Sequence, residues 1–323
     1  MKDRAGLTAR HARTKTLMSL NSLSRRSLVA SLLSAPLWAA RKQPKPPKIK
    51  APFTPPLGVQ LYTLRNVMKD PDPVLKTVAE IGYREVEILR ANMDQIAPIL
   101  KKYNLNPVSG HFETPTFTGD STHWVGFPAG YNTERAIEDA KRWGLSYIVC
   151  PYIMPADRGG LDVYRKLADQ LNRSGEAITK AGLQLCYHNH AFEFKGDEGE
   201  RPIDVLLERW DPKYVFLEAD VFWLSISGNV PEEMLKKMNG RVPLVHLKDK
   251  GWGTSTVYEE TAVRPEWYKE VGAGTIDFGP ILRTAAKVGV KHYFVEQDET
   301  PKDPLASIRL SYLNLRRMDL SNK

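Results

Sequence analysis

Short apolar runs alternate with longer amphipathic segments from Leu57 almost to the end of the chain. Polar side chains follow each run, which is the pattern of a strand buried within a sheet. Strands that alternate with helices form βαβ units and a parallel sheet, so the pattern predicts an α/β fold. The predicted strands are Gly58–Tyr62, Glu85–Leu89, Pro107–His111, Tyr147–Tyr152, Gln184–His188, Val215–Ala219, Val242–Leu247 and Tyr293–Gln297.

Between most of these runs, apolar residues recur with the spacing of one helix face. The clearest predicted helices are Asp72–Ile81, Thr133–Trp143, Gly160–Ala181 and Phe278–Val288, and a glycine follows each of them, as is common at helix C-termini. Eight strand–helix units over about 265 residues match a (β/α)8 TIM barrel that forms a single domain. A doubly wound open sheet is the alternative, but no G-x-G-x-x-G motif follows the first strand.

The N-terminal part of the chain has the pattern of an export signal. Arg25 and Arg26 precede an apolar run, Leu28–Ala40, which ends in small residues. The paired arginines resemble the twin-arginine type of signal, which carries folded proteins. We therefore expect residues 1–40 to be a signal region and the protein to be exported to the periplasm. The apolar run is too short to span a bilayer, so no stable membrane span is expected.

Residues 41–56 are rich in proline and lysine, and we expect them to form an extended, disordered linker before a barrel at 57–320. The positive charge of the chain, +8 over 323 residues, belongs to this N-terminal region. Residues 1–50 contain 12 Lys or Arg and one acidic residue, Asp3, whereas the rest contains 34 Lys or Arg and 37 Asp or Glu. The barrel therefore offers no general surface for nucleic acid.

Two further features have a simple structural interpretation. Cys150 and Cys186 lie in predicted strands and are expected to be buried free thiols, although a disulfide stays open in an oxidising compartment. The segment Val271–Thr275 contains two glycines but no following Lys-Ser/Thr pair. It therefore predicts a tight turn before the helix at Phe278–Val288 rather than a phosphate-binding loop.

Polar residues with catalytic chemistry stand at the ends of the predicted strands, where the active sites of TIM barrels lie. The richest stretch, Gly182–Phe194, carries His188 and His190, with Glu193 three residues further on. Two imidazoles and a carboxylate at one strand end suggest a metal or acid–base site. The polar residues at the other strand ends are Gln60, Tyr62, Glu87, His111, Tyr152, Asp220, His246, Lys248 and Glu296.

Six motifs at these strand ends form a recognisable set. They are Gly58–Arg65, Gly82–Ile88, Tyr187–His190, Asp220–Trp223, His246–Asp249 and Gly272–Phe278. Together they resemble the sugar phosphate isomerase/epimerase group of xylose isomerase-like TIM barrels, also called the AP endonuclease family 2 type. The resemblance covers the chain from Leu57 to Leu315 and specifies the superfamily better than the substrate.

The resemblance implies one divalent metal ion held by Glu, Asp, His and Glu from four strand ends. Asp220, His246 and Glu296 match the last three positions, but His188 stands at the first. We expect Glu193, five residues later, to supply the first ligand, because carboxylates suit Mn²⁺ or Mg²⁺. If His188 is the ligand instead, Zn²⁺ or Co²⁺ becomes the alternative.

The resemblance also implies a sugar isomerase or epimerase that moves the proton next to a carbonyl through an enediolate. Glu296 is the expected base, with His188 and Lys248 as further catalytic residues. Because an imidazole is a capable general acid, a lyase or hydratase that performs β-elimination on 3-keto-glycosides is the alternative. A non-catalytic sugar-binding barrel is a third hypothesis. Contacts to a small sugar or keto-sugar are expected from Gln60, Tyr62, Glu87, His111, His190, Trp223 and Trp252.

The export signal gives the first testable prediction. Replacing Arg25 and Arg26 with lysine keeps the charge but should remove the receptor-read pair, and the protein should then remain in the cytoplasm. Cell fractionation of the variant beside the unmodified protein measures this outcome. Normal export of the double-lysine variant would rule out the twin-arginine interpretation.

Overall fold

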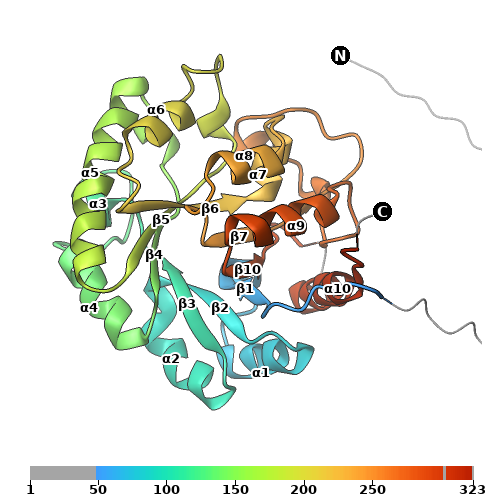
Figure 1. Cartoon of the computed structure of the whole chain (residues 1–323). Coiled ribbons are helices and arrows are strands. Elements are labelled where there is room, and N and C mark those ends of the chain that lie inside the picture. The colour runs from blue at the N-terminus through green and yellow to red at the C-terminus, as the bar shows by residue number, and fades with distance from the viewer. Residues whose placement is uncertain (1–48, 301–302, 322–323) are drawn as a thin grey trace, which may run out of the picture. The chain divides into compact units, whose positions relative to one another are not determined.

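The computed structural model describes residues 49–300 and 303–321. Within them, parallel strands close into a barrel in the order β1-β10-β7-β6-β5-β4-β3-β2 (Figure 1). The predicted (β/α)8 TIM barrel is therefore confirmed. Its strands are β1 (Gly58–Gln60), β2 (Glu85–Leu89), β3 (Asn106–His111), β4 (Tyr147–Cys150), β5 (Gln184–His188), β6 (Val215–Asp220), β7 (Leu244–Leu247) and β10 (His292–Val295).

Helices follow the strands and pack around the outside of the barrel (Figure 1). The α-helices are α1 (Pro71–Ile81), α2 (Met93–Lys102), α3 (Pro115–Thr118), α4 (Thr133–Trp143), α5 (Leu161–Lys180), α6 (Pro202–Arg209), α7 (Val221–Ile226), α8 (Pro231–Lys237), α9 (Phe278–Val288) and α10 (Pro304–Arg317). The short 3₁₀ turns are η1 (Leu61–Leu64), η2 (Arg90–Asn92), η3 (Pro155–Asp157), η4 (Phe192–Phe194), η5 (Glu260–Ala262) and η6 (Pro265–Trp267). None of these helices combines the length and apolarity needed to cross a lipid bilayer.

Local chemistry explains where the predicted boundaries shift. The first strand stops at Gln60, because its side chain accepts a hydrogen bond from the amide of Tyr62 and caps the turn η1. Strand β7 begins at Leu244 rather than Val242, since Pro243 has no N–H to donate to a ladder. Sequence periodicity also missed the small antiparallel pair β8 (Asp249–Lys250) and β9 (Tyr268–Lys269), which is too short to produce a repeat.

The interior of the barrel changes from apolar to polar along the strands. Alternate residues of a barrel strand point inward. Early in the strands these residues form an apolar cluster of Val108, Tyr147, Val149, Cys186, Leu244 and Phe294, with Phe216 packed against it. Later in β6 the inward positions are Glu218 and Asp220, and in β7 the corresponding buried polar residue is His246. The apolar half thus forms a floor beneath a polar half.

The linker prediction was wrong at its C-terminal end. Phe53 is buried, and its ring packs edge-on against Tyr293 at 5.1 Å between centroids. The backbone amides of Lys50 and Ala51 donate to the carboxylate of Asp319, and Arg316 donates to the carbonyl of Phe53. The folded unit therefore begins near residue 48 rather than at 57. Residues 1–48, including the predicted signal region, lie outside the described residues.

The glycine-rich segment after β9 wraps around a carboxylate of the protein itself. The buried Asp249 accepts hydrogen bonds from the amides of Gly272, Gly274 and Ile276. A Cβ at Gly274 would lie 2.3 Å from the carbonyl oxygen of Lys250, so only glycine fits there. The segment is thus the predicted tight turn, and its amides are used inside the fold rather than offered to a phosphate.

The two cysteines are free and buried, and no disulfide joins them. Burial raises the pKa of the Cys150 thiol to about 12, so this group stays protonated.

Candidate metal centre

Four side chains meet inside the C-terminal end of the barrel, one each from the ends of β5, β6, β7 and β10. They are His188, Asp220, His246 and Glu296, and their nearest nitrogen and oxygen atoms all lie within 4.8 Å of one another. Nε2 of His188 lies 3.3 Å from Oδ2 of Asp220, and Nδ1 of His246 lies 2.8 Å from Oε2 of Glu296. All four residues are buried. We call this set the upper cluster.

The protein fixes the orientation of each member. Oδ1 of Asp220 accepts from the amides of Phe222 and Trp223, where it caps α7, which leaves Oδ2 facing the cluster. Nδ1 of His188 lies 3.2 Å from the carbonyl oxygen of Pro151. Because a carbonyl oxygen can only accept, Nδ1 carries the hydrogen and the lone pair of Nε2 points into the cluster. This is the tautomer in which a histidine binds a metal ion.

Lys248 provides positive charge beside the upper cluster. Its Nζ lies 2.7 Å from Oε2 of Glu296, 3.1 Å from Oδ2 of Asp220 and 2.9 Å from Oδ1 of Asp298. Burial alone would lower the pKa of the Lys248 ammonium, but Asp220, Asp298 and Glu296 raise it well above its usual value. For the carboxyl group of Glu296, burial alone would raise the pKa, but Lys248 and His246 bring it below its ordinary value. Both groups are therefore charged at neutral pH.

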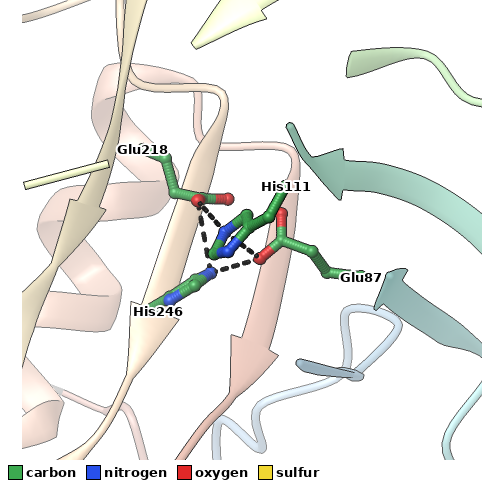
Figure 2. Close-up of side chains that lie close together, drawn as sticks. All are labelled: Glu87, His111, Glu218 and His246. Carbon is green, nitrogen blue, oxygen red and sulfur yellow. Dashed lines mark hydrogen bonds and ion pairs between the residues drawn. The ribbon is translucent and has the colours of Figure 1, made fainter. Parts of the chain in front are cut away.

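A second cluster is formed by Glu87, His111, Glu218 and His246 (Figure 2). We call it the lower cluster, because Glu218 precedes Asp220 of the upper cluster along β6. Oε2 of Glu87 lies 2.6 Å from Nε2 of His246 and 3.1 Å from Nε2 of His111. Oε2 of Glu218 lies 3.2 Å from the same atom of His111. His246 thus joins the two clusters, with one ring nitrogen in each.

The lower cluster has partners that hold it in place. Oε1 of Glu87 accepts from the hydroxyl of Ser109, and Oε2 accepts from the amide group of Gln60. Burial lowers the pKa of His111, but Glu87 and Glu218 together raise it to about 9. His111 is therefore an imidazolium between two carboxylates. A carboxylate that receives the N–H of a metal-binding histidine is a common outer partner in metalloproteins, and Glu87 is placed to do this for His246.

The donor set of the upper cluster fits a divalent cation. The lone pair of His188 Nε2 faces an oxygen of Asp220, so the two atoms repel each other unless a cation or a proton lies between them. Four buried carboxyl groups, those of Glu87, Glu218, Asp220 and Glu296, and the partly exposed Asp298 surround the basic groups of Lys248, His111 and His246. The carboxyl groups thus outnumber the basic groups. Two imidazoles with two carboxylates suit Zn²⁺, Co²⁺ or Mn²⁺.

Glu193, the first ligand expected from the sequence, points away from both clusters. It is buried, and its Oε1 accepts from the hydroxyl of Tyr187 while Oε2 accepts from the backbone amide of His190. His188 lies at the position where Glu193 was expected. Burial raises the pKa of the Glu193 carboxyl to about 8.

A cavity of about 720 Å³ lies above the upper cluster. It is lined by Tyr62, His111, His188, His190, Trp223, Lys248 and Glu296, as expected for substrate or catalytic groups. Two other predicted residues do not line it: Glu87 belongs to the lower cluster, and Gln60 donates a hydrogen bond to Glu87. Trp252 does not line the cavity, and 85% of its surface is exposed.

His190 differs from His188 in its bonding. It lines the cavity and packs against the rings of Trp223 and Tyr152. Among the described residues, neither of its ring nitrogens has a hydrogen-bond partner, and Nδ1 is buried. Burial and the neighbouring His188 and Lys248 lower the pKa of His190 well below its usual value, so the ring is neutral.

Sequence reasoning missed two members of the site, Glu218 and Asp298. Glu218 lies two residues before Asp220 in β6, and Asp298 lies two residues after Glu296. Period-two alternation places each on the same side as its partner, and this signal could have found both.

The model of a family described as "Xylose isomerase-like TIM barrel" matches residues 75–316. An inosose dehydratase of Geobacillus thermodenitrificans is 33% identical over 147 residues, covering 43% of this chain and 49% of that enzyme. The chain therefore spans about half the length of the curated relatives it matches.

Solved structures show the same fold. A sugar phosphate isomerase/epimerase from Parabacteroides distasonis superposes with a TM-score of 0.65 at 22% identity, covering 83% of this chain and 100% of that one. The IOLI protein, solved with a bound zinc atom, superposes with a TM-score of 0.60 at 14% identity, covering 83% of this chain and 100% of that one. At these identities the likeness establishes the architecture alone.

The geometry predicts that His188, and not Glu193, completes the ligand set. Replacing His188 with alanine should weaken binding of the ion more than the roughly 10–100-fold that removing an outer partner costs. Glu193→Gln should leave the affinity unchanged, because the Glu193 side chain faces Tyr187. Titration of Zn²⁺ and Mn²⁺ into metal-free protein measures both affinities. Tight binding by the His188 variant together with weak binding by Glu193→Gln would reverse the assignment.

Glu193 also predicts a pH dependence of stability. Its pKa is about 8 in the folded protein and about 4.5 when exposed. The fold therefore favours the protonated form. This contribution is complete below about pH 4.5 and is lost as the pH rises to about 8, at up to about 1.4 kcal/mol per pH unit. Glu193→Gln mimics the protonated acid, so it should gain free energy of unfolding relative to the unmodified protein over this range. Denaturant unfolding at several pH values tests this; a constant difference would contradict it.

Proposed function

The chain belongs to the xylose isomerase-like TIM barrel family, and from this premise we propose that it is a metal-dependent enzyme acting on a keto-sugar. The proposed first step removes the proton on the carbon next to the carbonyl. One observation carries the proposal: two groups line the same cavity. One is the carboxylate of Glu296, which Lys248 holds in place, and the other is His190, whose ring has no hydrogen-bond partner in the described part of the chain. They supply a proton acceptor and a hydrogen-bond donor around one substrate.

We propose that His188, Asp220, His246 and Glu296 hold one divalent ion. Such an ion would act as a Lewis acid on the carbonyl and an adjacent hydroxyl of the sugar. Beneath it, Glu87 accepts from Nε2 of His246 and keeps Nδ1 directed at the site. Aspartate and glutamate oxygens favour Mn²⁺, whereas two imidazoles favour Zn²⁺, so both are candidates.

Glu296 is the proposed base. Its carboxylate is fixed by Lys248 and His246, so little reorganisation is needed before it accepts a proton. The ammonium of Lys248 also lines the cavity and would favour the negative oxygen that forms when the proton leaves. The electrons of the broken C–H bond then form an enediolate of the sugar.

His190 is proposed to assist the departing group, in place of His188, because both ring nitrogens of His188 are engaged. When the enediolate collapses, the carbon–oxygen bond at the β-position breaks. The neutral ring of His190 can donate a hydrogen bond to the departing oxygen, which takes up the proton that Glu296 removed. The products are an α,β-unsaturated keto-sugar and water or an alcohol. The similarity to inosose dehydratases supports this lyase outcome.

Isomerisation or epimerisation, expected first from the sequence, remains the second candidate because it shares the proton-removal step. The placement of Glu193 favours elimination, since an epimerase with two opposed carboxylates would need the second one at this side of the cavity. The carboxylate of Glu193 is instead bonded to Tyr187 and the amide of His190.

The cavity also suits a neutral sugar better than a sugar phosphate. Arg90 lines the cavity, and so do the glutamate partners of Arg65 and Arg158. Each of these three arginines is paired with a glutamate. Arg90 bonds to Glu113 at 2.6 Å, Arg158 to Glu260 at 2.8 Å and Arg65 to Glu299 at 2.7 Å. With their charge already balanced, these arginines offer a phosphate little attraction. This agrees with the proposed export, since phosphorylated metabolites are intracellular.

Exchange of the α-proton with solvent tests the proposal. Candidate keto-sugars and 3-keto-glycosides are incubated with metal-loaded protein in deuterium oxide. The unmodified protein should incorporate deuterium and form an unsaturated product, and chelator should abolish both. Glu296→Gln should lose exchange by a factor of about 100 or more while the metal content of the same sample is monitored. His190→Gln should lower product formation more than exchange.

Exchange that survives both chelator and Glu296→Gln would refute the mechanism. Exchange without any unsaturated product would favour isomerisation or epimerisation over elimination. Sugar binding without exchange would indicate a non-catalytic barrel.

A further inference from the structure

The cavity extends well beyond the upper cluster. The four residues of that cluster come from β5, β6, β7 and β10, which are consecutive neighbours around the barrel. The rest of the lining includes Leu89 at the end of β2, Ala91 after it, Trp124 between α3 and α4, and Pro151 after β4. Strands β2, β3 and β4 form the other arc of the barrel. The cavity therefore runs from the chemical groups across to an apolar wall that the proposed reaction does not use.

Trp124 is the largest side chain of this wall, and its segment is held on both sides. Arg90 lies 4.8 Å from the ring of Tyr131 and 5.6 Å from that of Phe127, C-terminal to Trp124. On the other side, Nδ1 of His123 lies 2.5 Å from Oδ1 of Asp157 at the turn η3. The two attachments fix the backbone around Trp124 at the edge of the cavity.

The indole of Trp124 lacks the partners that other tryptophans have. In the described part of the chain, Trp143, Trp210 and Trp223 pack against other aromatic rings, and Arg264 covers Trp267. Trp124 and Trp252 have no such partner there, and of these two only Trp124 lines the cavity. A half-buried indole that is fixed in place and bare on its cavity side is suited to pack against a ligand.

Polar groups line the same cavity as Trp124. Glu113, Glu260 and Glu299 line the cavity, and their paired arginines hold them as fixed hydrogen-bond acceptors. A sugar ring presents an apolar C–H face and a rim of hydroxyl groups, which match a cavity lined by both an indole and carboxylates. The volume of about 720 Å³ lies in the upper part of the range, about 300–1,000 Å³, of small-molecule pockets. A single keto-sugar at the upper cluster would leave much of it unfilled.

We propose that Trp124 forms a second sugar subsite and that the substrate is a glycoside whose second ring stacks on this indole. The inference rests on the proposed function for the position of the first ring, but its test does not require turnover.

Direct binding measurements test the subsite. Cellobiose, maltose and glucose are titrated into the metal-loaded protein by calorimetry, with 4-nitrophenyl glucoside as an aromatic comparison. The unmodified protein should bind at least one of the two disaccharides about tenfold more tightly than glucose, which corresponds to about 1.4 kcal/mol. Trp124→Ala should remove this preference while leaving the affinity for glucose unchanged. Trp252→Ala, which removes an exposed tryptophan outside the cavity, is the matched control and should keep it.

Absence of a disaccharide preference in the unmodified protein, or its survival in Trp124→Ala, would overturn the proposal. A Trp124-dependent preference for the nitrophenyl glucoside alone would also overturn it, and would assign the platform to an aromatic group. Because only binding is measured, a failure of the proposed chemistry would appear as missing deuterium exchange with this preference intact.

Discussion

The structure depends on a concentration of carboxyl groups inside the barrel. Glu87, Glu218, Asp220 and Glu296 are buried in its C-terminal half, and the partly exposed Asp298 lies beside them. Isolated carboxylates would be protonated or would destabilise the fold in such a place. Lys248 and His111 are therefore required at its centre, and their own pKa values rise in response. The same imbalance makes the site attractive to a divalent cation, so the constraint that the fold must satisfy is also the source of the proposed chemistry.

The two layers of this polar half have different roles. Atoms that face the cavity, on His188, His190, Lys248 and Glu296, are available to an ion or a sugar. Atoms below, on Glu87, Gln60 and Ser109, bond to one another and to His246 and do not reach the cavity. The apolar floor lies beneath these groups. Around the mouth, the paired arginines and glutamates carry charge without adding a net field, so that recognition there relies on shape and hydrogen bonding.

Much of this could be predicted from the sequence because the barrel repeats. Alternation of apolar runs and helices reveals the fold, and the polar residues that end the strands reveal which face carries the site. Glu218 could also have been predicted, because it lies two residues before Asp220 and alternation along a strand places both on the same side. The direction of Glu193 could not be predicted, because it depends on the hydroxyl of Tyr187 and an amide that meet it only in the folded protein. Trp124 lies in the connection between α3 and α4. This connection has no periodic pattern of apolar residues, so the sequence does not predict where its side chains lie.

The docking of residues 49–56 has a consequence for the order of events during folding. The bond from the amide of Lys50 to Asp319 joins positions 269 residues apart. Closing so long a loop is favourable only after the intervening elements have packed, because the entropy cost must be recovered from contacts already made. Phe53 likewise needs Tyr293 on the last barrel strand before it has anything to cover. This short segment therefore becomes fixed only when the whole barrel has formed. In the sequence it follows the region expected to direct export, from which it is separated by residues 41–48.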